Sequence, residues 1–156
     1  NRVYLRAVLR ESRIKIYNAF ALGRLALTEF RYEEVQEHLR FIRAELSKVA
    51  AVRTMSLLVG DITLVNLDED INNSLVFLSK GCGSIYGLQF TLQPSGKPYF
   101  TYDEVKSYIN LLTSGNGLWD KERLLGPETT EGSLKNVAAS IGKRYGLTLD
   151  DIKHSN

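Results

Sequence analysis

The chain has 156 residues, of which 44% are hydrophobic and 24% are charged, so it can bury a core of its own and wholesale disorder is excluded. Its net charge of +2 does not by itself indicate a nucleic-acid partner, although residues 1–24, with six basic side chains against one acidic, hold +5 and leave −3 for the rest. A single cysteine excludes an intrachain disulfide, and no apolar run is long enough to span a membrane, so we expect an intracellular protein, cytoplasmic or nuclear.

The first fifty residues predict two antiparallel helices. Residues 2–27 form the first, and its apolar face is broader than one neighbouring helix covers. Residues 32–50 form the second, because apolar side chains between Val35 and Val49 recur at helical spacing. A short corner joins the two, so we expect an N-terminal helical hairpin as a separate domain over residues 1–50.

The composition then changes to residues that favour strands. Gly60-Asp61 has the form of a two-residue turn between two apolar runs, and Gly81 to Gly83 has the form of a second turn. Because the segments follow one another closely in the chain, antiparallel pairing of neighbours is the default. We therefore expect a small antiparallel sheet of four to five strands, with strands at 55–59, 62–65, 75–78, 85–92 and 99–100.

The clearest local pattern lies between residues 84 and 112. Pro94 to Lys97 predicts a tight turn in which Gly96 takes a positive φ. Thr101 stands three residues before Glu104, the spacing of a capping box that opens a helix. Apolar residues at helical spacing continue from there to Leu112, so a helix should follow the turn.

The C-terminal part predicts two more helices. Ser133 is a suitable cap for a helix that ends near Tyr145, and Thr148 for a short helix over 149–153. Helices thus stand before and after the predicted sheet. We therefore expect an α+β fold with a globular α+β domain over residues 51–156.

A local resemblance to a known family falls in the same stretch. It rests on nine residues: Pro94, Ser95, Gly96, Lys97, Thr101, Glu104, Val105, Tyr108 and Ile109. In residue type and spacing they resemble the second half of the methyl-CpG-binding domain over about 16 residues. The resemblance implies a strand, turn, strand and helix scaffold used for binding. Phe100 stands where that family has a basic residue, so recognition of methylated cytosine is not implied.

Few residues are candidates for catalysis or for metal binding. His38, His154 and Cys82 lie far apart in the sequence and give no zinc-ligand spacing, so we expect no metal. Cys82 stands between glycines without a neighbouring base, which favours a structural role over a nucleophile. We expect no cofactor, and an enzyme of unrecognised class is the weakest of the three functional readings.

The first helix carries the candidate binding residues. Its apolar positions predict an interface for self-association or for a protein partner: Val3, Leu5, Val8, Leu9, Ile14, Ile16 and Tyr17. Its basic positions, with one lysine from the turn, could contact phosphates: Arg2, Arg6, Arg10, Arg13 and Lys97. A third possibility is that these arginines pair with glutamates between Glu29 and Glu37 of the second helix.

The sequence therefore predicts a non-catalytic protein-interaction or assembly module. We expect it to be part of a larger nuclear or nucleic-acid-associated complex, with no membrane partner. The alternative is a domain that binds DNA or RNA directly through the basic N-terminal helix, by phosphate contacts.

Overall fold

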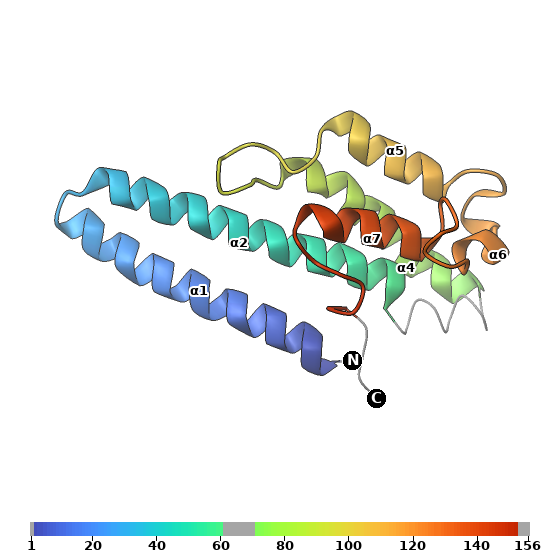
Figure 1. Ribbon diagram of the computed structural model, residues 1–156, viewed down its shortest axis with the longest axis horizontal. Coiled ribbons are helices and arrows are strands. Elements are labelled where there is room, and N and C mark those ends of the chain that lie inside the picture. The colour runs from blue at the N-terminus through green and yellow to red at the C-terminus, as the bar shows by residue number, and fades with distance from the viewer. Residues whose placement is uncertain (1, 61–70, 153–156) are drawn as a thin grey trace.

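The computed structural model describes residues 2–60 and 71–152, with side chains from residue 9 onward except those of residues 71 and 73. Its two longest helices, α1 (Arg2–Thr28) and α2 (Tyr32–Val59), form an antiparallel hairpin, as expected from the sequence (Figure 1). Three further helices gather around the far end of α2: α4 (Ile71–Gly87), α5 (Tyr102–Leu112) and α7 (Leu134–Arg144). The tip of the hairpin therefore projects away from the rest of the molecule.

Short elements join the helices in the C-terminal half. The 3-10 helix η1 (Leu88–Phe90) follows α4 directly, and a second one, η2 (Gly117–Trp119), follows α5. The four-residue helix α6 (Lys121–Leu124) lies between η2 and α7. Within the described residues, none of the helices is both long and apolar enough to span a bilayer.

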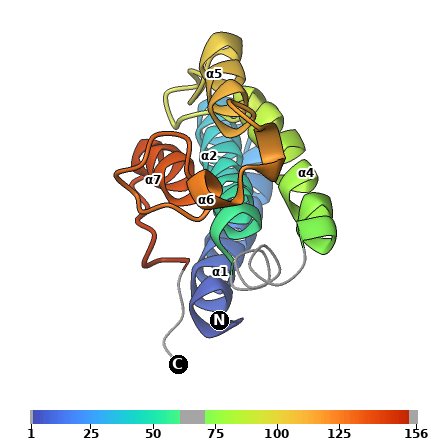
Figure 2. The same ribbon diagram turned by 90° about the vertical axis from the view of Figure 1, so that its right-hand side faces the viewer.

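The main core surrounds the second half of α2. Looking along the molecule, α4 lies on one side of α2 and α7 on the other (Figure 2). The residues that α2 contributes are buried on more than one face of the helix, and they pack against apolar side chains of the neighbouring helices: Val52, Met55, Leu58 and Val59 with Leu78, Ile85, Val137 and Ile141. This core ends near residue 51. Just beyond it, α2 contacts the loop after η1, where the Ser47 hydroxyl accepts a hydrogen bond from the Leu92 backbone N–H at 2.9 Å. From there to the tip, α1 and α2 pack against each other.

The hairpin is held together by small residues. Ser12, Ala19 and Ala26 follow one another at intervals of seven residues, which places them on one face of α1, and all three are buried. Side chains of this size allow two helix backbones to approach closely. The corner between the helices contains Phe30 with a φ of 59°, a left-handed conformation that is uncommon outside glycine.

The expected α+β fold is wrong. Among the described residues the structure has no sheet, and the only strand-like pairing is an isolated bridge between Leu92 and Pro98. Residues 55–59 belong to α2, residues 75–78 to α4, and the segment 85–92 to α4, η1 and the loop after them. The strand expected at 62–65 and the second residue of its turn, Asp61, lie outside the described part of the chain.

The error has a physical cause. The end of α2 lies between α4 and α7, so apolar residues occur on more than one of its faces and the 3.6-residue pattern is lost. The sequence predicts a turn at Gly81, yet this residue lies within α4 and is buried against α2. A Cβ atom at Gly81 would lie 3.0 Å from Leu58 Cδ2, so glycine serves helix packing here. The domain boundary expected at residue 50 falls inside α2.

The turn and cap predictions are confirmed. Gly96 has a φ of 82°, and the Gln93 and Lys97 backbones close the turn with an N–H to O distance of 2.8 Å. Thr101 and Glu104 form the expected capping box at the start of α5. Ser133 accepts a hydrogen bond from the backbone N–H of the third residue of α7 at 3.0 Å. The short helix expected after Thr148 is a turn over the described residues 149–152.

Candidate interaction surface

Large apolar side chains are exposed along the projecting part of the hairpin. Because the small residues of α1 bring the helices close together, little room remains between them, and large side chains lie at the sides of the seam. Those that are exposed come from both helices and from the corner: Ile14, Tyr17, Phe20, Leu22, Leu25, Leu27, Phe30, Tyr32, Leu39, Phe41 and Leu46. Their number on two neighbouring helices distinguishes this region from an ordinary protein surface, where apolar residues are scattered singly.

The first flank of the hairpin consists of Phe20 and Leu27 from α1 and Leu39 from α2. These residues line one depression of about 150 Å³, together with the side chain of Arg24. Ile42 of α2, which is buried, also lines this depression. The first flank is therefore a continuous apolar surface across both helices.

The second flank lies on the opposite side of the seam and is centred on Leu22 of α1 and Phe41 of α2. They line a depression of about 310 Å³ together with Lys15, Asn18 and His38. A Cβ atom at Gly23 would lie 3.4 Å from His38 Cβ, so His38 occupies space between the helices that a larger residue on α1 would fill. This contact gives His38 a structural role.

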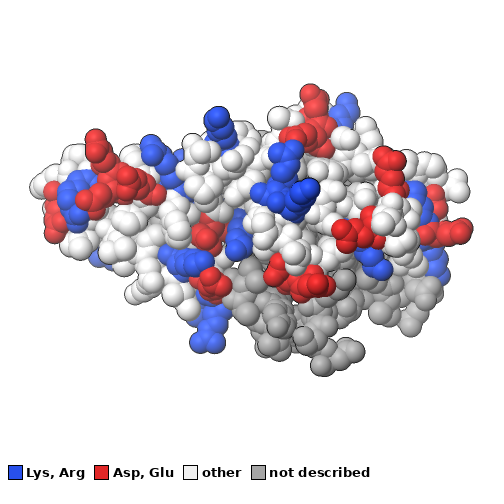
Figure 3. Space-filling model, viewed as in Figure 1, with Lys and Arg blue, Asp and Glu red and all other residues white. Residues whose placement is uncertain are grey.

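Charged residues are distributed unevenly along the hairpin. Residues 29–37, at the tip, hold four glutamates and one arginine, whereas residues 9–21 and 42–53, nearer the core, hold six basic and two acidic residues. In Figure 3, acidic side chains gather at the free end of the hairpin and basic ones predominate further along. Arg31 pairs with Glu29 at 2.6 Å and also with Glu34. The hairpin therefore has a negative end and a positive middle.

The structure describes four of the seven side chains of the interface predicted on α1. Ile14 and Tyr17 are exposed, Ile16 is half-buried, and Leu9 packs partly against the core. The side chains of Val3, Leu5 and Val8 lie outside the described part of the chain. The sequence did not predict that the apolar residues from Phe20 to Leu46 are exposed. The seven-residue repeat of small side chains on α1 could have revealed them, because it predicts a seam too narrow to bury its large neighbours.

The basic residues do not form one group. Arg10 and Arg13 are exposed on α1, and Lys97 is exposed in the turn before α5. That turn lies on the other side of α2 from α1, so Lys97 is separated from the arginines (Figure 1). The side chains of Arg2 and Arg6 lie outside the described residues. Pairing of Arg10 or Arg13 with the tip glutamates is excluded, because at least about 16 Å of helix separates them.

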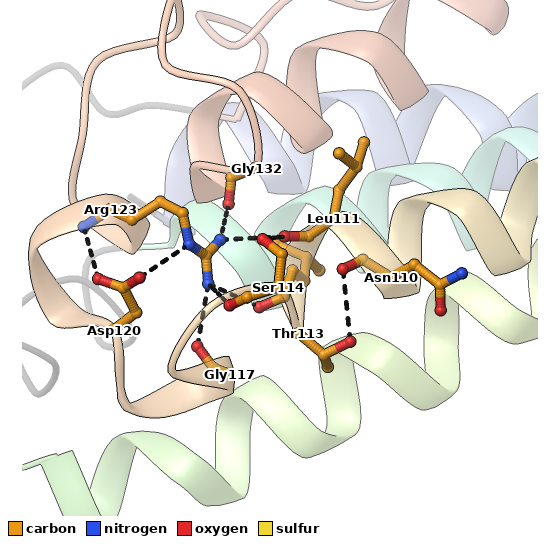
Figure 4. Close-up of polar contacts among 9 residues, drawn as sticks. Asn110, Leu111, Thr113, Ser114, Gly117, Asp120, Arg123 and Gly132 are labelled. Carbon is orange, nitrogen blue, oxygen red and sulfur yellow. Dashed lines mark hydrogen bonds and ion pairs between the residues drawn. The ribbon is translucent and has the colours of Figure 1, made fainter.

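The densest polar cluster surrounds Arg123 of α6 (Figure 4). Its guanidinium group donates hydrogen bonds to five backbone carbonyls, those of Leu111, Leu112, Ser114, Gly117 and Gly132, at 2.6–3.2 Å. The Nε atom also lies 3.2 Å from Asp120 Oδ2. Because the side chain is only 16% exposed and its donors already have acceptors, it joins the end of α5 to the start of α7 and is not available to bind an anion.

Two buried groups have shifted pKa values. Burial raises the pKa of the Cys82 thiol, which lies within α4 beside the core. Burial also raises the pKa of Tyr145 to about 12, and its hydroxyl lies 2.6 Å from Thr91 Oγ1. Both groups are therefore protonated near neutral pH, as structural residues are. Among the described residues, no three histidine, cysteine or acidic side chains come together in a way that could hold a metal ion.

Fold and surface together define an all-helical protein with a projecting, apolar helical hairpin. The chain belongs to the family described as Domain of unknown function (DUF4856), whose model matches residues 2–148. The expected resemblance to the methyl-CpG-binding domain is wrong, because the match over nearly the whole chain is to this other family. Neither a curated protein nor a solved structure matches the chain.

Proposed function

We propose that the protein is an interaction module whose helical hairpin docks onto another protein. One observation supports this above all others: apolar side chains are exposed on both flanks of the hairpin seam. A helix with apolar residues on several sides is typical of helices that are enclosed by others. Among the described residues, α1 and α2 pack mainly against each other between the tip and Ser47, so both flanks there have space for a partner.

Magnitudes support the same conclusion. Full burial of a Leu or Phe side chain contributes about 1.5–3 kcal/mol, and those on the hairpin are roughly half exposed, so each has about 1 kcal/mol left to gain. Association of two proteins costs on the order of 4–15 kcal/mol in lost freedom of motion. Burial of both flanks, with the aromatic residues that interfaces favour, is of the size needed for a stable complex.

The nucleic-acid alternative has weaker support from the structure. Sequence-independent binding needs several basic groups that follow the phosphate backbone. Arg10 and Arg13 share one helix, but Lys97 lies on the other side of α2. Association with a nucleic-acid complex thus stays a prediction from the sequence.

Site-specific photo-cross-linking in the cell tests the proposal. A benzophenone amino acid would replace Phe20 or Phe41, with Trp119 of η2 as the matched control, because Phe20 and Trp119 are similarly exposed, at 53% and 57%. We expect covalent adducts with a protein from the two hairpin positions and none from Trp119. Unchanged circular dichroism would show that all three variants are folded.

Absence of an adduct at both hairpin positions would contradict the proposal. Equal capture from Trp119 would also contradict it, because the hairpin would then be no more in contact with proteins than the rest of the surface.

A further inference from the structure

The second flank carries opposite charges at equal distances on the two sides of its apolar centre. On α1, Lys15 stands seven residues before Leu22, and Glu29, the first residue after the helix, stands seven residues after it. On α2, Glu34 stands seven residues before Phe41, and Lys48 stands seven residues after it. Seven residues are two helical turns, so each triplet lies on one side of its helix.

In both triplets the glutamate lies nearest the tip and the lysine lies nearest the core. Because α1 and α2 are antiparallel, Glu29 and Glu34 both lie toward the tip, and both contact Arg31 there. Lys15 and Lys48 both lie about 10 Å from the apolar centre in the opposite direction. The second flank therefore has an acidic end, an apolar centre and an end with two lysines.

The centre of this flank is open. Leu22 is 52% exposed and Phe41 is 42% exposed, and the depression between them is also lined by Lys15. The side chains of Lys15, Glu29 and Glu34 are each exposed by 42% or more. All the groups needed for docking are thus accessible, with Lys48 half-buried beside them.

We propose that the partner on the second flank is a second copy of this chain, packed antiparallel to the first. This inference rests on the proposed function and names its partner. A twofold axis at the level of Leu22 and Phe41 brings each of these residues against its own counterpart. The same axis sets Glu29 against Lys15 of the other copy, and Glu34 against Lys48. The result is a four-helix bundle in which neighbouring helices are antiparallel.

Charge explains why the pairing is antiparallel. Residues 29–37 carry a net −3, whereas residues 9–21 and 42–53 carry a net +4, with Glu11 and Glu45 included. A parallel pair would place the two negative tips together, and an antiparallel pair places each tip beside a positive middle. The pairs that Arg31 and Lys15 already make are exposed, and exposed pairs contribute little to stability, so they can rearrange at little cost.

Light scattering and sedimentation of the purified chain test the inference. We expect a dimer of twice 17.6 kDa for the natural sequence at micromolar concentration. Leu22→Glu with Phe41→Glu should give a folded monomer. The matched control, Phe20→Glu with Leu39→Glu on the first flank, should still form a dimer. A monomeric natural chain at high micromolar concentration, or loss of the dimer only in the control, would overturn the inference.

A charge exchange tests the orientation. One variant carries Glu29→Lys with Glu34→Lys, and the other carries Lys15→Glu with Lys48→Glu. Each alone should dimerise at least about tenfold more weakly than the natural chain, because like charges then face each other. An equimolar mixture should form a dimer of one copy of each, with the affinity restored. Unchanged dimerisation of the separate variants would overturn the antiparallel arrangement.

The cross-linking result separates this inference from the proposed function. An adduct between two copies of the chain supports both. An adduct with a different protein, together with a monomeric purified chain, overturns the second-copy inference and leaves the interaction module standing. A monomeric chain that gives no adduct from the hairpin overturns both.

Discussion

Replacement of Arg123 by Met is expected to lower the free energy of unfolding by about 3–5 kcal/mol, the range found when one partner of a buried charged pair is removed. Met retains most of the aliphatic volume but donates no hydrogen bond. Five backbone carbonyls and the Asp120 carboxylate would lose the hydrogen bonds that the guanidinium group donates to them. Urea unfolding, followed by circular dichroism, measures the change.

Arg144→Met is the control for this prediction. Arg144 also pairs with a carboxylate, that of Glu104, but its side chain is 47% exposed and the pair is solvated. We expect a change of no more than about 1 kcal/mol there. If Arg123→Met cost as little as Arg144→Met, the cluster around α6 would not be what joins α5 to α7.

Gly142→Ala is expected to destabilise the protein by about 1–3 kcal/mol, although the same change in an open helix position is favourable. Gly142 lies in α7 where that helix crosses α2. A Cβ atom there would lie 2.7 Å from Met55 Cε and 2.8 Å from the carbonyl oxygen of Leu147. The methionine can move, but the carbonyl belongs to the backbone, so α7 would have to shift away from the core. Thermal unfolding measures the effect.

Gly83→Ala in α4 provides the control of opposite sign. A Cβ atom at Gly83 would meet nothing within 4 Å, and the residue is helical and exposed. Alanine should therefore stabilise this position by about 0.5–1 kcal/mol, because it restricts the unfolded chain more than glycine does. Stabilisation by Gly142→Ala as well would contradict the close packing of α7 on α2.

Local signals predicted local structure well. The capping box at Thr101, the positive φ of Gly96 and the cap at Ser133 depend on a few neighbouring residues, and the structure contains all three. The helical hairpin was also predictable, because apolar residues of α2 between Val35 and Val49 recur at helical spacing. These features need no knowledge of what packs against them.

The predicted sheet is wrong in segments whose secondary structure depends on what packs against them. Residues 55–59 and 75–78 are apolar on adjacent positions, a pattern that fits a buried strand and a buried helix equally. Residues 55–59 are helical because they pack against α4 and α7, and residues 75–78 because α4 packs against α2. These contacts cannot be read from the sequence. The turn predicted at Gly81 is wrong for the same reason, because this glycine lets Leu58 of α2 approach α4 closely.

The candidate surface was only partly predictable for a related reason. The exposure of Ile14 and Tyr17 could be predicted, because the apolar face of α1 is wider than one neighbouring helix covers. Leu22 and Phe41 read equally well as core residues. They are exposed because Ala19 and Ala26 narrow the seam of the hairpin, a consequence of how the two helices meet.

The central claim is that the apolar side chains of the hairpin serve an interface and not the core of this chain. The most direct test is the free energy of unfolding of the Leu22→Glu, Phe41→Glu variant at submicromolar concentration, where association contributes little. We predict a value within about 1 kcal/mol of the natural chain, since both side chains are already in contact with water. A loss of about 3 kcal/mol or more, as expected when charge enters a core, would contradict the account.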